Sequence, residues 1–359
     1  MIRHVVFKNF KSLKSIAIST APLTILSGLN GIGKSSFMQA ILLLKQLKDE
    51  ELLLNGEWTP IRVGKDLIYK SAEDDDVILS FETADGGTAD VKITVATKNQ
   101  DSDGLPWTHS PDDAQETVSA LAARLRYLSA ERLAPQARHQ KSLSNLRASN
   151  LGIHGEFAIH YLFANSAVKV KRLVALKGVE LSLFSQVNAW LDNISPGVRA
   201  EISEREADLT LAFSYLRENG ERTDSFTPEN VGFGLSSVLP VVIALLVPDD
   251  NILLIENPES NVHPQGQAEL GRLIAMSAAA GKQLFVETHS DHIINGVCVA
   301  VKENLIPQHD VKIAFFEKIN KDGEQYADVR EIRVDQNGTL SDYPVDFMDE
   351  WNNQLGKLV

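Results

Sequence analysis

A short glycine-rich segment constrains the fold of this 359-residue chain more than any other feature. Residues 28–35 read GLNGIGKS and fit the pattern G-x-x-x-x-G-K-[ST]. The segment before it, LTILS, is apolar and predicts a strand, and the apolar residues after it recur at helical spacing. A strand, a glycine-rich turn and a helix in this order place backbone N–H groups where an anion can bind. The sequence therefore predicts an α/β core with a phosphate site at the start of its first helix.

This glycine loop (residues 28–35) predicts a nucleoside triphosphate site. The glycines let successive N–H groups point inward, Lys34 would bridge the β- and γ-phosphates, and the Ser35 hydroxyl would ligate Mg²⁺. The expected cofactors are therefore ATP and Mg²⁺. The candidate nucleotide-binding residues here are Gly28, Asn30, Gly31, Gly33, Lys34, Ser35 and Ser36.

Composition narrows the class of protein. The chain is 43% hydrophobic and 23% charged, as globular proteins are. Its one cysteine, Cys298, cannot form an intramolecular disulfide, and its longest apolar run, residues 238–247, is too short to span a membrane. The N-terminus lacks the apolar stretch of a signal peptide, so we expect a cytoplasmic protein without a membrane contact. A net charge of −13 repels nucleic acid, so any contact with it would need a local basic patch. The candidate patches lie in residues 124–147 and 169–177.

Strand and helix patterns alternate along the chain. The N-terminal half predicts strands within residues 1–27, a helix over 35–48, a hairpin around 85–87, a polar mobile insertion over 98–117, helices over 118–126, 156–163 and 180–190, and a second hairpin over 209–226. The C-terminal half predicts helices from Ser236, over 263–280 and from Asp291, and strands over 252–255, 284–286, 312–316 and 328–334. This order favours an α/β core interrupted by a helical region.

The expected domain organisation follows from this alternation. Residues 1–100 would form the N-terminal part of the core, and residues 226–330 its C-terminal part. Residues 101–225 would form an inserted region of helices and a hairpin, and residues 331–359 a tail segment.

Two apolar strands of the C-terminal half end in residues suited to metal and phosphate. Residues 252–255 run directly into Glu256, and residues 284–286 run into Glu287, with His289 two positions later. A carboxylate at a strand end can hold Mg²⁺ or one of its waters, and an imidazole can reach a γ-phosphate. These residues therefore complement the glycine loop.

With these motifs the sequence resembles the ABC-type ATPases of the SMC-like and OLD-like group, in particular the bacterial AAA-family ATPases that end in a domain of unknown function. The matching stretches span nearly the whole chain in the expected order: FKNFKSL, GLNGIGKSS, YLSAERLAP, VGFGLSSVLPVV, LLIENPESNVHPQGQ, ETHSDH and GTLSDYPVDFMDEW. The resemblance implies an α/β fold, that of an ABC-type P-loop ATPase head with a mixed central sheet and an inserted helical region.

The resemblance also implies roles for residues outside the glycine loop. Glu256 would be the Walker B acid and, with Ser35, a metal ligand, and His289 would be the switch histidine. The stretch VGFGLSS would be the signature, with its glycines facing the γ-phosphate on a partner subunit. Its candidate residues are Gly232, Gly234 and Ser236. Its glycines and serines are ordered differently from those of the ABC signature, so which serine touches phosphate stays open.

The residue after Glu256 departs from the family pattern. This position usually holds a glutamate that orients or deprotonates the attacking water, but here it is Asn257. An amide can hold a water and cannot take its proton. Either hydrolysis is slow, or Glu259 or Glu287 supplies the carboxylate. Arg132, in YLSAERLAP, is either a phosphate sensor or an ordinary surface arginine.

Together, the residues and the resemblance predict a slow ATPase that converts ATP and water to ADP and phosphate. The signature follows the glycine loop at a long distance in the chain, which suits completion of the site by a second subunit, so we expect a homodimer or higher oligomer. The resemblance places such a protein in anti-phage defence or DNA maintenance, where it would act as a switch for a separate effector protein. The alternative is a slow or non-hydrolysing nucleotide sensor that scaffolds a partner.

Overall fold

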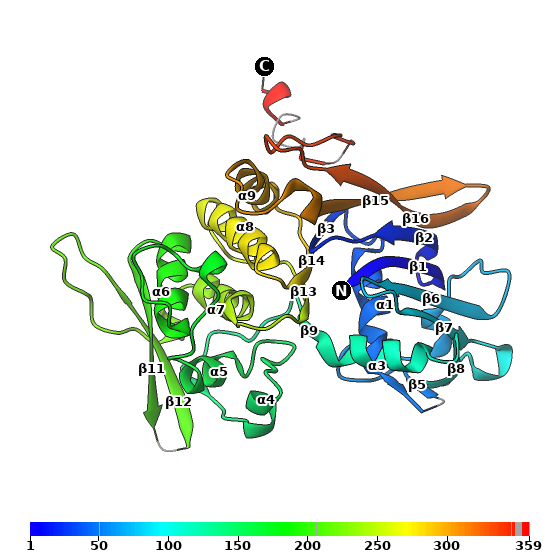
Figure 1. Cartoon of the computed structure of the whole chain (residues 1–359), viewed down its shortest axis with the longest axis horizontal. Coiled ribbons are helices and arrows are strands. Elements are labelled where there is room, and N and C mark those ends of the chain that lie inside the picture. The colour runs from blue at the N-terminus through cyan, green and yellow to red at the C-terminus, as the bar shows by residue number, and fades with distance from the viewer. Residues whose placement is uncertain (50, 206, 346, 349–353, 359) are drawn as a thin grey trace. The chain divides into compact units, whose positions relative to one another are not determined.

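The computed structural model describes the whole chain except residues 50, 206, 346, 349–353 and 359. The described chain forms two compact units, each assembled from segments that are distant in the sequence (Figure 1). The first unit contains Met1–Leu125, Val311–Arg333 and Leu340–Val359, and the second contains Arg126–Asp310 and Val334–Thr339. Four residues of the tail stretch GTLSDYPVDFMDEW lie outside the described residues: Asp346, Asp349, Glu350 and Trp351.

The first unit consists mainly of strands. They are β1 (Ile2–Phe10), β2 (Leu13–Ser19), β3 (Leu23–Gly28), β4 (Leu47–Lys48), β5 (Glu51–Leu53), β6 (Asp76–Thr83), β7 (Thr88–Thr94), β8 (Gly104–Ser110), β15 (Val311–Lys321) and β16 (Glu324–Arg333). Its helices are α1 (Lys34–Leu42), α2 (Gly64–Leu67) and α3 (Ala114–Arg124), with 3₁₀ turns η1 (Leu43–Lys45) and η2 (Thr97–Asn99). An antiparallel sheet has the order β2-β1-β6-β7-β8-β5-β4. Elsewhere β15 pairs antiparallel with β16 and parallel with β3.

Helix α1 is held by aromatic side chains from both groups of strands in the first unit. The ring of Phe37 on α1 lies 5.4 Å from that of Phe7 on β1 and 6.1 Å from that of Phe316 on β15, measured between centroids. All three side chains are fully buried. Aromatic pairs of this kind stabilise beyond the area they bury, by about 0.5–1.5 kcal/mol each. The helix that follows the glycine loop is therefore fixed in place.

The second unit consists mainly of helices. They are α4 (Leu143–Arg147), α5 (Ala158–Ala164), α6 (Leu183–Ile194), α7 (Phe233–Leu246), α8 (Pro264–Ala279) and α9 (Asp291–Lys302), with 3₁₀ turns η3 (Arg172–Val174), η4 (Pro228–Asn230) and η5 (Gln308–Asp310). Its strands are β9 (Leu125–Leu128, of which Leu125 belongs to the first unit), β10 (Arg138–His139), β11 (Val198–Arg205), β12 (Asp208–Tyr215), β13 (Ile252–Glu256) and β14 (Gln283–Glu287). Strands β14, β13 and β9 are neighbours, and β10, β12 and β11 form a small separate sheet.

Strands β13 and β14 are the buried centre of the second unit. They pair in parallel, and their apolar residues are almost completely inaccessible. Helices α8 and α9 lie side by side (Figure 1). Glycine permits this close approach, since a Cβ at Gly271 would lie 2.3 Å from the Ile293 carbonyl oxygen and one at Gly296 would lie 2.2 Å from that of Ala268. A run of buried apolar residues in both strands is what parallel strands covered by helices require.

The α/β fold class predicted from the sequence is confirmed, and so is the order of strand, glycine loop and helix at residues 23–42. The hairpin around residues 85–87 is also present, as β6 and β7. Three local predictions need correction.

The first helix is shorter than predicted. It ends at Leu42, continues as the turn η1, and gives way to β4 instead of running to residue 48. Gln46 explains the change, because its buried side chain donates to Leu53 O at 2.7 Å and accepts from Thr59 N at 2.7 Å. These hydrogen bonds pair backbone groups of the segment around Leu53 and Thr59, and this contact between distant segments outweighs the helical pattern.

The segment over residues 98–117, which we predicted as a polar mobile insertion, contains regular structure. It contains β8, which pairs with β5 and β7, and the start of α3. Leu105 and Trp107 of β8 are buried at alternate positions, which is the strand period. Prolines and charges around these two residues hid that signal in the sequence.

The second predicted hairpin is present only in part. Residues 208–215 form β12, but this strand pairs along its full length with the preceding β11. The segment after β12 also turns back on it, with antiparallel bridges from Phe213 to Phe226 and from Leu216 to Arg222. The predicted turn is therefore present, and the correction is that the longer strand pairing lies before β12.

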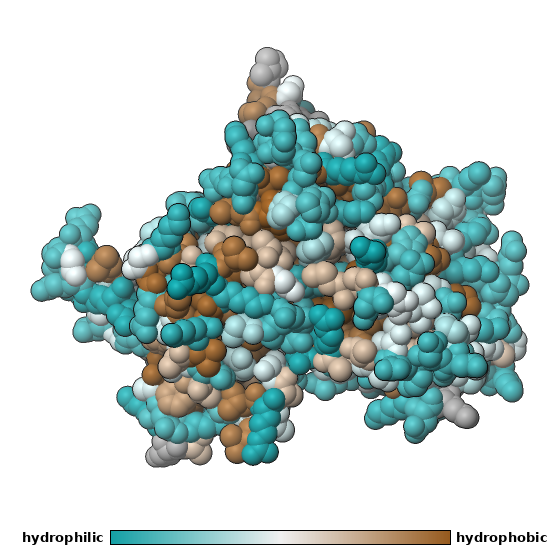
Figure 2. Space-filling view, in the orientation of Figure 1, coloured by the Kyte–Doolittle hydropathy of each residue, from teal (hydrophilic) through white to brown (hydrophobic). Residues whose placement is uncertain are grey.

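Hydrophilic residues cover most of the face drawn in Figure 2, with smaller apolar areas between them. Exposed apolar side chains include Leu29, in the glycine loop, and Phe233, at the start of α7. In the part of the chain that the structure describes, none of the helices combines the length and the hydropathy needed to cross a membrane.

Candidate functional site

The glycine loop connects the end of β3 to the start of α1 in the first unit. Gly28, Gly31 and Gly33 have φ angles of 129°, 74° and 130°, a region that favours glycine. Space also requires glycine at two of these positions. A Cβ at Gly28 would lie 2.4 Å from the Phe316 carbonyl oxygen, and one at Gly33 would lie 2.9 Å from side-chain atoms of Ser12 and Leu13. Around Gly31 there is open space.

Lys34 lies at the first position of α1 and turns back over the glycine loop. Its Nζ donates to Gly28 O at 2.8 Å and to Leu29 O at 2.7 Å, and its side chain is buried. Asn30, Gly31 and Ser35 are exposed. The loop thus joins a buried cation, a helix N-terminus and accessible backbone, which is the chemistry that binds phosphate groups.

Glu256 and Glu287 end two neighbouring strands of the second unit. They are register partners at the carboxyl ends of β13 and β14, and Glu287 is buried. Side chains of directly paired residues point to the same face of a sheet. We call Glu256, Asn257, Glu259, Glu287 and His289 the carboxylate edge, because all five belong to these strand ends or to the loops that follow them.

The side chain of Glu256 is held by residues on β9 and directly after it. Its Oε2 accepts from Ala130 N at 3.1 Å, and its carboxylate also takes a hydrogen bond from the Tyr127 hydroxyl. Burial raises the pKa of Tyr127 strongly, and the charges of Glu256 and Glu287 add to that rise. Tyr127 therefore stays protonated and acts as a hydrogen-bond donor.

Asn257 has a backbone conformation that explains its residue type. Its φ is 42°, in the left-handed region where asparagine is better tolerated than most residues. Its N–H donates to Glu287 O at 2.8 Å, which ties the loop after β13 to the end of β14. The side-chain Oδ1 is buried and has no hydrogen-bond partner within the described residues. This oxygen is available to a water or a ligand.

Glu259 and His289 lie together. The Oε1 of Glu259 accepts the backbone N–H of His289 at 2.9 Å, whereas its Oε2 is buried and has no partner among the described residues. His289 is exposed, and the next residue, Ser290, caps α9 by accepting from His292 N and Ile293 N. Glu259 therefore holds the loop that presents His289.

Arg132 is attached to the backbone at the end of β13. Its Nη2 donates to Glu256 O at 2.7 Å, and its Nη1 lies 3.4 Å from Asn257 O. Burial lowers the pKa of Arg132 to about 10, and the charges of Glu259 and Glu256 oppose that shift. It is therefore a partly buried cation attached to the backbone of the carboxylate edge and not an ordinary surface arginine, whereas its role as a phosphate sensor stays a prediction.

The stretch VGFGLSS forms the N-terminus of α7. Gly232 and Phe233 are exposed, and a Cβ at Gly234 would lie 2.3 Å from the Asn261 carbonyl oxygen, so α7 begins against the loop that follows β13. The Ser236 Oγ is buried with no partner in the described residues. A pocket of about 250 Å³ adjoins this point, with Ser195, Tyr215, Gly232, Gly234, Asn261 and His263 among its lining residues.

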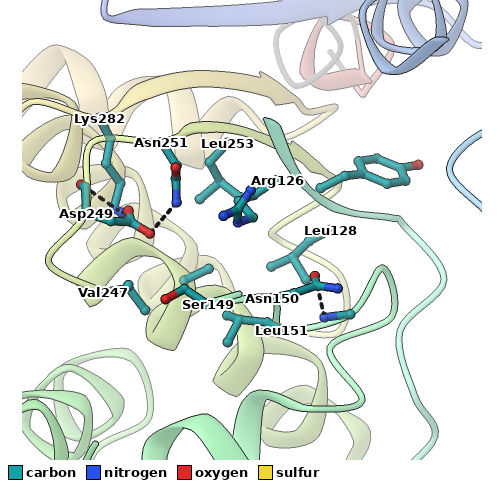
Figure 3. A pocket seen from close by; sticks show the side chains of 13 residues that line it. Arg126, Leu128, Ser149, Asn150, Leu151, Val247, Asp249, Asn251, Leu253 and Lys282 are labelled. Atoms are coloured by element: carbon teal, nitrogen blue, oxygen red, sulfur yellow. Dashed lines mark hydrogen bonds and ion pairs between the residues drawn. The ribbon is translucent and has the colours of Figure 1, made fainter. Parts of the chain in front are cut away.

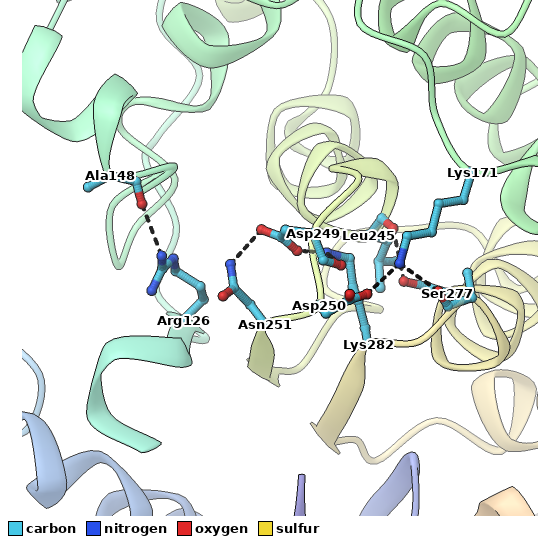
Figure 4. A network of polar contacts seen from close by, with 10 residues as sticks. Arg126, Ala148, Lys171, Leu245, Asp249, Asp250, Asn251, Ser277 and Lys282 are labelled. Atoms are coloured by element: carbon cyan, nitrogen blue, oxygen red, sulfur yellow. Dashed lines mark hydrogen bonds and ion pairs between the residues drawn. The ribbon is translucent and has the colours of Figure 1, made fainter. Parts of the chain in front are cut away.

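A second pocket lies at the other end of β13, among the side chains labelled in Figure 3. Its volume of about 20 Å³ suits a single water, which is far too small for a nucleotide. Lys282 is buried there and pairs with Asp249, which also accepts from Asn251 at 2.5 Å (Figure 4). Burial lowers the pKa of Lys282, and Asp249 opposes that shift. This network is a paired, structural feature and not a second nucleotide site.

The predicted metal donors fit Mg²⁺ chemically. In the described ranges, no group of three or more His, Cys, Asp or Glu side chains could hold a metal ion. Mg²⁺ at a nucleotide needs only one or two protein ligands, because phosphate oxygens and waters supply the rest. The exposed Ser35 hydroxyl and the Glu256 carboxylate are oxygen ligands of the kind Mg²⁺ prefers.

The sequence did not reveal Tyr127 as a functional candidate. Both Tyr127 and Arg132 lie in the stretch YLSAERLAP, which carried the family resemblance but had no chemical pattern of its own. Both residues bind Glu256, which lies 124 positions after Arg132 in the chain. Only the three-dimensional structure brings them to Glu256.

Comparison with known proteins supports one family. Residues 23–295 match the family described as AAA domain, putative AbiEii toxin, Type IV TA system. Residues 306–358 match a protein of unknown function, DUF3696. The chain is 23% identical over 325 residues to the OLD nuclease of Thermus scotoductus, a match that covers 81% of this chain and 59% of that protein. The chain thus spans less than two thirds of this curated relative.

Two solved structures share the fold. One is an SMC head bound to the C-winged helix domain of ScpA, with a TM-score of 0.60, 16% identity and coverage of 93% of this chain and 98% of that one. The other is an Smc head domain with an extended coiled coil, bound to the C-terminal domain of ScpA derived from Pyrococcus furiosus. Its TM-score is 0.55 at 12% identity, with 99% of both chains covered.

Proposed function

Because the chain belongs to this AAA-domain family and is an ABC-type P-loop ATPase of the SMC-like and OLD-like group, we propose that it binds Mg-ATP and hydrolyses it to ADP and phosphate. The observation that carries this proposal is the geometry of the glycine loop. Lys34 Nζ, held by Gly28 O and Leu29 O, lies beside exposed backbone at the start of α1. On binding, the phosphates would replace these carbonyls as partners of Lys34.

In this proposal each group of residues has a separate role. The glycine loop, including Asn30 and Ser36, binds the phosphates, and Ser35 and Glu256 ligate Mg²⁺, which neutralises charge on the β- and γ-phosphates. Asn257 holds the attacking water through its unpartnered Oδ1. His289 donates to the γ-phosphate, and Glu259 positions its loop.

The general base is assigned to Glu287 and not to Glu259. Glu287 is the register partner of Glu256, so its carboxylate shares the strand end with the metal ligand. Glu259 already uses one oxygen to hold the His289 backbone. A general base is worth about 10²–10⁴-fold in rate.

The proposal includes a dimer. The N-terminus of α7 presents exposed Gly232 and Phe233, with Gly234 and Ser236 directly behind them, and this end would bind the γ-phosphate held by a second copy. By family resemblance, the ATP-bound dimer acts in the cytoplasm as a switch for a separate effector, in anti-phage defence or DNA maintenance. Whether the chain also binds nucleic acid through a basic patch is left open in this proposal.

A second candidate function is a nucleotide sensor that does not hydrolyse ATP. Asn257 favours it, because its left-handed backbone selects asparagine over the glutamate expected at this position. Such a protein would still close around Mg-ATP and would release it unchanged.

Steady-state phosphate release by the purified protein, with Mg²⁺ or with EDTA, separates the two candidates. The ATPase proposal expects Mg²⁺-dependent release, and ATP binding without release would favour the sensor. Light scattering tests the dimer in parallel, with Glu287→Gln used to slow turnover because it leaves the proposed Mg²⁺ ligands in place. A rise in mass on adding Mg-ATP is expected, and an unchanged mass would contradict nucleotide-driven closure.

A further inference from the structure

One short segment, Tyr127 to Arg132, holds both the side chain and the backbone at the end of β13. The Tyr127 hydroxyl and Ala130 N bind the Glu256 carboxylate, while the guanidinium of Arg132 binds the carbonyls of Glu256 and Asn257. A planar guanidinium donates in fixed directions, so it can fix two adjacent carbonyls where a lysine could not. The conformation of the strand end is thereby set from outside β13.

The segment is itself held firmly. Ser129 Oγ donates to Glu131 O at 2.6 Å, and His154 Nδ1 lies 2.6 Å from the same carbonyl. Ser129 N donates to Ile153 O at 2.9 Å and Leu133 N to His154 O at 3.2 Å. Arg132 therefore reaches β13 from a rigid base, which a positioning residue needs.

Electrostatics favour the same role. Arg132 is partly buried and lies near the charges of Glu256 and Glu259, which it balances. A cation beside two carboxylates limits their repulsion.

We propose that Arg132 is a positioning residue that fixes the Glu256 carboxylate for Mg²⁺ and the Asn257 side chain for the attacking water, so that turnover depends on it and nucleotide binding does not. This inference rests on the proposed ATPase function. It differs from phosphate sensing, which would require Arg132 to exchange these carbonyls for phosphate oxygens, and the ATP Kd in EDTA separates the two roles.

Three variants test the inference. Arg132→Met removes the guanidinium and keeps a long side chain, Arg132→Lys keeps only the charge, and Arg126→Met is the matched control. Arg126 lies on β9, six residues before Arg132, and is likewise partly buried. Its Nη2 donates to Ala148 O at 3.0 Å, at the end of β13 away from Glu256 (Figure 4). For each variant, calorimetry gives the ATP Kd in EDTA and in Mg²⁺, and phosphate release gives kcat and KM.

Arg132→Met should lower kcat by about 100-fold, because misplacement of a catalytic group by about 1 Å costs that much. Its ATP Kd in EDTA should stay within twofold of wild type, and the gain in affinity from Mg²⁺ should shrink toward none. Arg132→Lys should fall between wild type and Arg132→Met. Arg126→Met should keep wild-type kcat even if its melting temperature falls as much as that of Arg132→Met.

Specific results would overturn the inference. A folded Arg132→Met with wild-type kcat and wild-type Mg²⁺ gain would do so, as would a loss of ATP affinity in EDTA, which would make Arg132 a phosphate ligand. An equal fall in kcat for Arg126→Met would reduce the effect to general stability. If Arg132 variants fail to fold, Tyr127→Phe removes one hydrogen bond to Glu256 and should lower kcat by about 3- to 10-fold; no change would then count against positioning by this segment.

The two proposals can fail separately. A wild-type protein that releases no phosphate contradicts the ATPase function. The inference is then tested by the gain in ATP affinity that Mg²⁺ gives. This gain must still be smaller in Arg132→Met than in wild type and in Arg126→Met.

Discussion

The glycine loop in the first unit and the carboxylate edge in the second differ in how their polar groups are satisfied. Lys34, the only lysine of the loop, has two carbonyl partners within the loop itself. At the carboxylate edge and beside it, Asn257 Oδ1, Glu259 Oε2 and Ser236 Oγ are buried without a hydrogen-bond partner in the described chain. A buried polar atom left in this state costs about 1–3 kcal/mol.

This difference has a functional consequence. The glycine loop is complete through local sequence and can bind phosphate as soon as Lys34 exchanges its partners. The carboxylate edge keeps unpaired oxygens, which a hydrated metal and a nucleotide would satisfy. We therefore expect changes in the glycine loop to act on affinity and changes in the carboxylate edge to act on turnover.

The largest effect is expected for Lys34→Ala, which removes the cation of the glycine loop. ATP affinity should fall about 1,000-fold, equivalent to about 4 kcal/mol, because several charge-assisted hydrogen bonds are lost together. Lys45→Ala is the control, since Lys45 lies one turn beyond α1 with its Nζ 4.3 Å from the Trp58 ring. Unchanged affinity in a calorimetric titration of folded Lys34→Ala would contradict the assignment.

Glu287→Gln should lower kcat by about 100-fold with little change in ATP affinity, because it removes the proton acceptor and keeps the shape. Glu259→Gln keeps an acceptor oxygen for His289 N and should cost less than 10-fold. If the two variants exchange these outcomes in a phosphate-release assay, Glu259 is the base. If both keep wild-type turnover, the base lies elsewhere.

Asn257→Asp is a cleaner probe than Asn257→Glu of whether the position after Glu256 can host the base. Aspartate tolerates the φ of 42°, whereas glutamate would add backbone strain of about 1–2 kcal/mol. With Glu287 as the base, we expect kcat to change by less than 10-fold, and downward, because a further carboxylate repels the γ-phosphate. An acceleration of 10-fold or more would mean that wild type lacks a base and is tuned to stay in its ATP-bound state.

The smallest effect concerns Cys298, which reports on the second unit alone because it is the only cysteine in the sequence. Burial raises the pKa of this thiol to about 11, from an ordinary value near 9. Its contribution to stability is therefore complete below pH 9 and is lost as the pH rises toward 11, by about 1 kcal/mol at pH 9.5. Denaturant unfolding of wild type and Cys298→Ala should diverge in this window, and parallel pH profiles would contradict the burial.

The sequence predicted those elements of the fold that depend on residues close together in the chain. The glycine loop, the strands that end at Glu256 and Glu287 and the helix from Asp291 follow from patterns within about ten residues, and the structure has these elements. The roles of the site residues and the four-part domain division stay predictions.

What the sequence could not predict depends on contacts between distant segments. The attachment of Arg132 to Glu256 joins the segment after β9 to β13, and the early end of α1 depends on a loop held by Gln46. The left-handed φ of Asn257 likewise becomes visible only where the loop meets Glu287 O. Periodicity carries no information on such pairings.

Glu256→Gln tests the division between affinity and turnover most directly, measured as ATP Kd in EDTA and phosphate release in Mg²⁺ on the same preparation. Glu303→Gln, which removes a charge from the surface pair with Arg272, is the matched control. The account predicts an ATP Kd within threefold of wild type and a fall in phosphate release of at least 100-fold for Glu256→Gln alone. Wild-type turnover in that variant, or a loss of ATP affinity as large as that of Lys34→Ala, would contradict it.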